Sequence, residues 1–156
     1  HEILELGFFV QRPDINNSNA EEQTIHLVDK GKNEAKMLKL EERVSFLGYS
    51  NSISSLLKRH DIAIQSSNYE GFGISALEAM ASGTPLIGSD VKGLAEVVEG
   101  GGLLFQLGNE NDLVDKILLL EDKAYYLQKS KDGIKNSLQY SIENTAKKYI
   151  TLYKGE

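Results

Sequence analysis

The sequence contains no cysteine and no tryptophan, and only two of its 156 residues are proline. The absence of cysteine excludes a disulfide framework and a thiolate metal site, and it favours a reducing compartment. No apolar run reaches the roughly eighteen residues that a membrane-spanning helix needs. We therefore expect a cytoplasmic protein without a spanning helix.

Positive charge is also in short supply, because 17 basic residues stand against 23 acidic ones and the formal net charge is −6. This balance argues against nucleic acid as a partner. An apolar content of 40% is enough to bury a core, and the length predicts a single compact domain. A domain of this size can also be one half of a larger protein.

Short apolar runs alternate with longer segments of helical spacing, which predicts β-α units around a parallel sheet. Apolar residues spaced i, i+3, i+4 predict helices around Ile53–Leu57 and Leu94–Val98. We expect an α/β fold with a Rossmann-like, doubly wound parallel sheet. The candidate strands are Thr24–Val28, Arg43–Leu47, Asp61–Gln65, Pro85–Ser89 and Gly102–Phe105.

The two ends of the chain differ in character. Arg12–Gln23 is rich in Asn and Ser and contains Pro13, so it predicts a surface connection. Beyond Phe105 the pattern predicts helices only, with Ser141 as a candidate N-cap of the last one. These three helices are expected over Glu110–Glu121, Lys123–Leu138 and Ser141–Lys154.

Nine of the fourteen glycines lie between Gly71 and Gly108. Two of them, Gly71 and Gly73, join the candidate strand Asp61–Gln65 to a predicted helix over Ile74–Ser82. The amino end of such a helix directs free N–H groups and a positive dipole end toward the carboxyl edge of the sheet, which suits a phosphate or an electron-rich hydroxyl. Alternatively, the glycines only make a tight turn.

Two glutamates flank this turn. Glu78 lies about 40° around the helix from Ile74, on the flank of a face with Leu77 and Ala81 that we expect to pack on the sheet. Glu70 lies in the loop before the helix, so the two carboxylates could accept hydrogen bonds from the vicinal hydroxyls of a sugar. The alternative is that Glu78 is a solvated residue or an ion-pair partner.

The same turn also matches another pattern. Gly71, Gly73 and Ala76 fit the G-x-G-x-x-A of dinucleotide-binding folds, and Asp90 follows the next strand, where a ribose-binding acid could lie. This would indicate an NAD-binding module. Against it, three candidate strands precede the turn, whereas the fingerprint normally follows the first strand of its fold.

The stretch from Arg43 to Phe105 resembles the C-terminal domain of retaining GT-B glycosyltransferases of the glycosyltransferase family 4 type. Glu70 and Glu78 fall on the two glutamates of that family's E-x7-E motif. The residues that carry the resemblance are Arg43–Gly48, Asp61–Ile64, Ser67, Glu70–Ile74, Leu77–Pro85 and Gly93–Val98.

The resemblance implies a role for each matched residue. Glu70 would be the catalytic residue and contact hydroxyls of the transferred sugar, while Glu78 would hold the ribose. The sugar and diphosphate would also meet Gly71, Phe72, Gly73 and Ile74. The base would lie beside Tyr49, Ser50 and Asn51.

It also implies an activity and a domain organisation. Residues 1–156 would be the donor-binding domain, with His1–Gly7 in a helix and Ser141–Tyr153 returning toward the other domain. An N-terminal acceptor domain, the first strand and the basic residues that neutralise the diphosphate would lie upstream of His1. The reaction would transfer a hexose-type sugar with retention from a nucleotide sugar, with UDP favoured. The acceptor would be a glycan or lipid-linked molecule in cell-surface polysaccharide synthesis, and no metal or cofactor would be needed. A non-catalytic domain that binds sugar nucleotides is a third hypothesis.

Some residues are better explained without chemistry. His26 and His60 have no third partner at a recognisable spacing, so we expect packed or hydrogen-bonded side chains and no metal site. Lys92 is expected to face solvent. In the last helix, lysines alternate with Tyr149, Tyr153 and aliphatic residues; docking of another domain explains this pattern, and contact with a membrane surface is the alternative.

Overall fold

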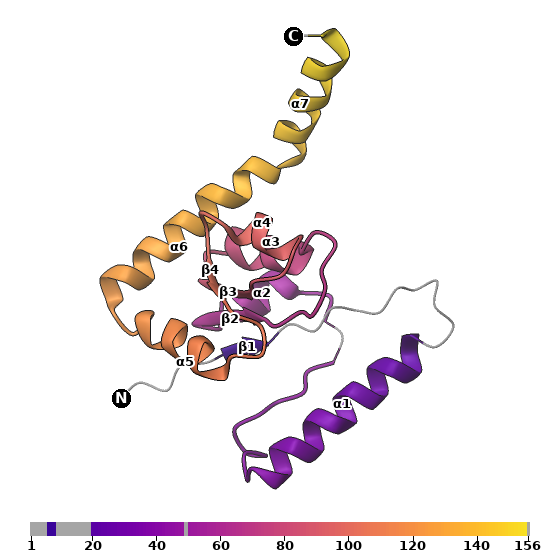
Figure 1. Ribbon diagram of the computed structural model, residues 1–156, viewed down its shortest axis with the longest axis vertical. Coiled ribbons are helices and arrows are strands. Elements are labelled where there is room, and N and C mark those ends of the chain that lie inside the picture. The colour runs from indigo at the N-terminus through magenta and orange to yellow at the C-terminus, as the bar shows by residue number, and fades with distance from the viewer. Residues whose placement is uncertain (1–5, 9–19, 49, 156) are drawn as a thin grey trace. The chain divides into compact units, whose positions relative to one another are not determined.

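The computed structural model of the chain describes residues 6–8, 20–48 and 50–155 (Figure 1). They belong to two compact units, one made of His1–Val10 and Ser52–Glu156 and the other of Gln11–Asn51. The first unit contains a parallel sheet in the order β1-β2-β3-β4, and three of its strands lie where the sequence predicts them. The strands are β1 (Leu6–Phe8), β2 (Ile62–Gln65), β3 (Leu86–Ser89) and β4 (Leu103–Phe105).

The helices of this unit confirm the predicted spacing. Short helices α2 and α4 span Ile53–Leu57 and Leu94–Val98, and α3 joins β2 to β3. Three longer helices follow β4, and a 3₁₀ turn over Leu138–Tyr140 separates the last two. Their bounds are Ile74–Ala81 for α3, Glu110–Leu119 for α5, Lys123–Ser137 for α6 and Ile142–Lys154 for α7.

Helices cover both faces of the sheet because successive strand residues point to opposite sides. Ala63 and Leu86 belong to one buried cluster with residues of α2, α3 and α4. Ile62, Ile64 and Ile87 belong to a second cluster, against which α5 packs. Figure 1 shows α3 and α4 on one side of the strands and α5 on the other. This two-sided covering confirms the predicted α/β architecture and explains why all four residues of β2 are buried.

Helix α6 makes contacts on both sides of the sheet. Near its start, Tyr126 packs against the second cluster, and burial together with the nearby carboxylate of Asp61 raises the pKa of this tyrosine. Farther along, Ser130 Oγ donates a 2.6 Å hydrogen bond to the carbonyl oxygen of Gly83, just after α3. The buried Asn136 donates from Nδ2 to the carbonyl oxygen of Val97 in α4, at 2.7 Å. These side chains fasten α6 to the α3/α4 layer.

Helix α7 continues beyond the 3₁₀ turn and extends away from the sheet (Figure 1). Ser141 caps it as predicted, since its hydroxyl accepts from the Asn144 N–H at 3.3 Å. Its large apolar side chains are exposed, and Tyr153 reaches 90%. Among the described residues, no helix combines the length and the hydropathy required to cross a bilayer.

The second unit corrects two predicted strands. Thr24–Val28 lies inside helix α1 (Ala20–Met37), because the Ala, Glu, Gln and Lys residues on both sides of this short run favour helix. Arg43–Leu47 forms no strand. Instead, the Phe46 ring packs close to Gly31 of α1, and the Lys32 ammonium lies 6.0 Å from its centroid. Every side chain from Arg43 to Leu47 is exposed, so this run lacks the burial on both faces that is typical of a strand in a parallel sheet.

The N-terminal expectations also change. Leu6 and Gly7, expected in a helix, belong to β1 and pair with Ile62 and Ala63 of β2. Glycine is a poor helix former, and pairing with a buried strand provides the backbone partners that a helix would otherwise supply. Of the predicted surface connection Arg12–Gln23, the last four residues open α1, and residues 12–19 lie outside the described part of the chain.

Candidate functional site

The loop from β2 to α3 holds a buried carboxylate. Glu70 is 6% exposed, and three N–H groups donate to it. Gln65 Nε2 donates to Oε2 at 2.8 Å, while Oε1 accepts from the Gly71 N–H at 3.1 Å and from the Phe72 N–H at 3.5 Å. A carboxylate has about four lone-pair positions, so Glu70 can still accept from a ligand hydroxyl.

Neighbouring elements fix this loop from two sides. Ser89, at the end of β3, donates from Oγ to the carbonyl oxygen of Ser67 at 2.7 Å. Gly93 lies directly on the backbone of Glu70: a Cβ at this position would overlap the Glu70 carbonyl oxygen and lie 3.1 Å from the carbonyl carbon. Gly93 also has φ +88°, a conformation that glycine adopts without strain. The backbone of Glu70 therefore has little freedom to shift.

The amino end of α3 faces outward beside Glu70. Gly73 is its N-cap with φ +84° and provides no capping side chain. Within the described part of the chain, the N–H groups of Gly73, Ile74 and Ser75 have no hydrogen-bond acceptor. Phe72 and Ile74 are 47% and 67% exposed, so a ligand can reach this end of the helix at these two residues, while Gly73 between them is buried. This end of α3 presents donors and a positive dipole end, as the sequence predicts.

Helix α3 buries a different face from the one expected. Ala76, Ala79 and Met80 are buried, whereas Ile74 is exposed. The small alanines allow α3 to pack closely on its neighbours, which the apolar spacing alone did not reveal. Glu78, four residues after Ile74, is exposed on the same side of the helix. The site thus contains one buried carboxylate and one exposed carboxylate.

The alternative dinucleotide pattern fits this geometry less well. Each glycine of that fingerprint has a steric task, but a Cβ at Gly71 would meet nothing within 4 Å. The turn follows β2, the second strand of the described sheet, rather than the first. Asp90 is exposed, and its N–H donates to the carbonyl oxygen of Phe105 at 2.8 Å. None of these three observations supports an NAD-binding role for this turn.

Several predicted residues need separate mention. Tyr49 lies outside the described residues, and Ser50 and Asn51 belong to the other unit, so their place beside a base stays a prediction. His60 is hydrogen-bonded as expected, with Nδ1 donating to the carbonyl oxygen of Leu56 at 2.8 Å. Lys92 is exposed. Within the described ranges, no three His, Asp or Glu side chains gather as metal ligands would.

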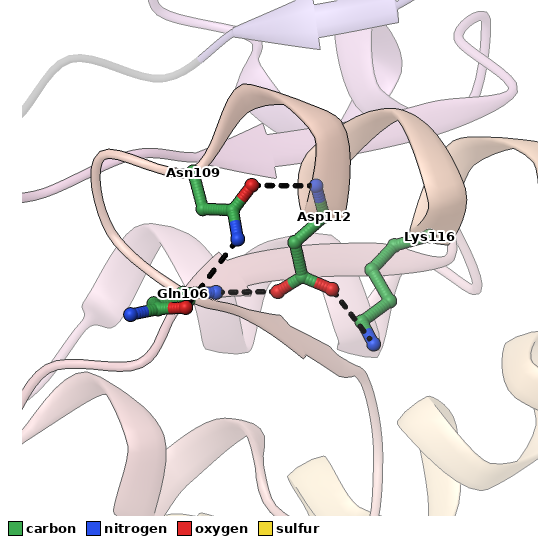
Figure 2. A network of polar contacts seen from close by, with 4 residues as sticks. All are labelled: Gln106, Asn109, Asp112 and Lys116. Carbon is green, nitrogen blue, oxygen red and sulfur yellow. Dashed lines mark hydrogen bonds and ion pairs between the residues drawn. The ribbon is translucent and has the colours of Figure 1, made fainter.

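A second polar network lies where β4 joins α5 (Figure 2). Asp112 accepts from the Gln106 N–H at 2.7 Å and pairs with Lys116 at 3.2 Å, while its own N–H donates to Asn109 Oδ1 at 3.1 Å. The Gln106 hydrogen bond and the adjacent lysine hold the pKa of Asp112 below its ordinary value. The hydrogen bonds join the end of β4 to the start of α5, and the ion pair lies along α5, so this network is structural.

Sequence reasoning missed three residues that support Glu70, namely Gln65, Ser89 and Gly93. The signals were a glutamine inside an otherwise apolar buried strand and a serine and a glycine around the next strand end. Such residues can be recognised in a sequence, but their common target cannot, because it depends on which loops the sheet brings together.

Comparison with known proteins identifies the domain. A family model described as glycosyl transferases group 1 matches residues 21–140, and the chain belongs to this family. A Campylobacter jejuni enzyme, N,N'-diacetylbacillosaminyl-diphospho-undecaprenol alpha-1,3-N-acetylgalactosaminyltransferase, is 38% identical over 113 residues. That alignment covers 70% of this chain and 30% of the enzyme. The predicted resemblance is therefore confirmed.

Solved structures agree with this assignment. Sucrose-phosphate synthase from Thermosynechococcus elongatus has a TM-score of 0.76 at 28% identity, over 96% of this chain and 37% of its own. Anabaena HepE in complex with UDP and glucose has a TM-score of 0.74 at 25% identity, over 83% of this chain and 36% of its own. The fold is that of a GT-B glycosyltransferase domain, and the chain spans about a third of the length of the proteins it matches.

Proposed function

We propose that this domain binds the nucleotide-sugar donor of a retaining glycosyltransferase. The intact protein would transfer a hexose-type sugar, with UDP as the favoured nucleotide, to a glycan or lipid-linked acceptor at the cytoplasmic membrane face. Transfer would serve cell-surface polysaccharide synthesis and would need no metal. The acceptor would bind mainly to a part of the protein outside residues 1–156.

The observation that carries the proposal is the buried, fully oriented carboxylate of Glu70 beside the open amino end of α3. The free N–H groups of Gly73 and Ile74 suit a diphosphate, and the remaining lone pair of Glu70 suits a sugar hydroxyl. The exposed Glu78 is available for the two ribose hydroxyls. HepE, a solved relative, contains UDP and glucose, which supports a uridine nucleotide here.

The chemistry follows from this arrangement. In a retaining transfer by front-face attack, the bond to the diphosphate breaks ahead of bond formation and leaves an oxocarbenium-like sugar. A fixed carboxylate near the ring stabilises that positive character, while helix N–H groups stabilise the departing diphosphate. Glu70 would orient the sugar and stabilise charge, so its removal should lower turnover more than donor affinity.

Ligand-induced thermal stabilisation tests the donor class. We would measure unfolding of the 156-residue chain with UDP, GDP, ADP and NAD, each at about five times an expected Kd of ~1 mM. Linkage then gives about 1 kcal/mol, or roughly 2–4 °C for a domain of this size. We expect UDP to stabilise the chain, and Glu78→Ala to abolish the shift without lowering the unliganded Tm, because the side chain is exposed. A shift with NAD alone would contradict the proposal.

Sugar transfer itself requires the intact protein. With UDP-hexoses and a panel of lipid-linked and glycan acceptors, wild-type protein should release UDP in an acceptor-dependent manner. Glu70→Ala should reduce kcat strongly and leave donor affinity nearly unchanged. Donor binding without transfer to any acceptor would favour a non-catalytic sugar-nucleotide-binding domain instead.

A further inference from the structure

Gln65 is the least expected side chain near the site. It is the last residue of β2, a strand buried along its whole length, and its side chain is 2% exposed. A glutamine in such a position is costly unless its amide is hydrogen-bonded. Its Nε2 donates to Glu70 Oε2 at 2.8 Å and lies 3.4 Å from Ser67 Oγ, so the carboxylate is its principal partner.

The amide oxygen of Gln65 shows that the hydrogen bond to Glu70 decides the orientation of this side chain. Oε1 is buried, and within the described residues it has no hydrogen-bond partner. An unpartnered buried acceptor is unfavourable. Turning the amide over would place Oε1 against the carboxylate of Glu70, acceptor against acceptor, which is worse. The side chain therefore leaves its own oxygen unsatisfied in order to donate to Glu70.

The sheet register provides the space for this arrangement. Gln65 pairs with Gly88 of β3, so on the β3 side no strand side chain stands beside it on the α3/α4 face. A Cβ at Gly88 would already approach Val98 and Leu94 of α4. The amide can thus reach from the strand to the loop while remaining shielded from solvent.

The hydrogen bond from Gln65 affects the direction of the Glu70 lone pair that remains free for a ligand. The Gly71 and Phe72 N–H groups both donate to Oε1 and come from the same loop as the carboxylate. Gln65 is the donor to Oε2 and comes from the sheet, outside this loop. We propose that Gln65 is a positioning residue that fixes the plane of the Glu70 carboxylate against the sheet, so that one lone pair keeps a constant direction toward the donor sugar.

This inference rests on the proposed glycosyl transfer and adds a determinant of its rate. The nucleotide would be held by the α3 N–H groups and by Glu78, which Gln65 does not contact. A loosened Glu70 would therefore impair the chemical step and spare donor binding. Replacing a residue that only filled space would not slow the chemical step while sparing donor binding.

The test uses the intact protein with Gln65→Met, which keeps an unbranched side chain but removes the donor. The matched control is Thr84→Val, because Thr84 is 4% exposed and donates a buried 2.9 Å hydrogen bond to the Leu57 carbonyl oxygen, ahead of β3 and away from Glu70. We expect Gln65→Met to lower kcat about 10- to 100-fold with the donor KM within about threefold of wild type. Thr84→Val should leave both parameters unchanged at a comparable loss of Tm.

Wild-type kcat in Gln65→Met would overturn the inference, and so would an equal loss of kcat in Thr84→Val. If Gln65→Met does not fold, Gln65→Asn replaces it, since its amide is one methylene too short to reach Glu70. A measurement on wild-type protein is independent of either variant: the Gln65 side-chain amide protons should exchange slowly with solvent and exchange faster in Glu70→Ala. Fast exchange in wild type would also overturn the inference. If wild type transfers no sugar, the proposed function fails, and this exchange measurement still tests the Gln65–Glu70 bond.

Discussion

Replacing Gly93 by alanine should damage the site through the backbone of Glu70. The backbone at Gly93 has φ +88° and ψ −53°, and an alanine there costs about 1–2 kcal/mol through backbone strain at positive φ. The added Cβ would also overlap the Glu70 carbonyl oxygen and lie 3.1 Å from the Gly71 carbonyl oxygen. Both neighbours are backbone atoms, so relief requires movement of the loop, at a further cost of about 1–3 kcal/mol.

These contributions add to a destabilisation of about 3 kcal/mol. For a chain of 156 residues this lowers Tm by roughly 6–12 °C. The movement also displaces Glu70, and a shift of about 1 Å at a catalytic group costs about a hundredfold in rate. We therefore expect Gly93→Ala to be both less stable and far less active than wild type.

Substitutions at two other glycines distinguish backbone strain from overlap of the added Cβ. Gly100→Ala shares the positive φ, at +82°, but its Cβ would meet nothing within 4 Å. It should lower Tm by roughly 2–8 °C and leave turnover unchanged. Gly71 has no positive φ, and a Cβ there would meet nothing within 4 Å, so Gly71→Ala should not lower Tm. The assays are thermal unfolding of the chain and sugar transfer by the intact protein. Equal Tm and equal kcat for Gly93→Ala and Gly100→Ala would refute the overlap argument.

Two further substitutions probe the scaffold around the site. Asp112→Asn should destabilise the chain at pH 7, because the Gln106 N–H and Lys116 favour the ionised carboxylate and lower its pKa. The ordinary pKa of an aspartate is ~3.9, and above that pH the lowered pKa in the folded state contributes its full stabilisation. This stabilisation is lost as the pH falls through the folded-state pKa, so the difference in Tm between wild type and variant should shrink below pH ~4. A difference that is constant from pH 7 to pH 3 would contradict this. Asn136→Ala removes the buried hydrogen bond to the Val97 carbonyl oxygen, so it should cost about 2 kcal/mol and lower Tm by roughly 4–8 °C; an unchanged Tm would show that α4 and α6 are held together by other contacts.

The sequence predicted the central β-α units because each carried its own local signal. The runs at Asp61–Gln65, Pro85–Ser89 and Gly102–Phe105 are bounded by glycine or polar residues, and the helices between them have a clear apolar spacing. The matched residues between Arg43 and Phe105, with Glu70 and Glu78 among them, indicated the family, which the comparison confirms. Thr24–Val28 failed because a five-residue apolar run fits a helix as well as a strand, and its neighbours decided in favour of helix.

Local pattern by itself determined the strand-loop-helix unit that carries both glutamates, along with the Ser141 cap and the absence of disulfide chemistry. Only the tertiary structure decided which face of α3 is buried, that Glu70 is buried while Glu78 is exposed, and that Gln65 and Gly93 converge on Glu70. The physical reason is the separation along the sequence of the residues that interact. Helix periods and turn residues are set by neighbours a few positions away, whereas these contacts arise when parallel pairing brings the ends of β2 and β3 to one edge of the sheet.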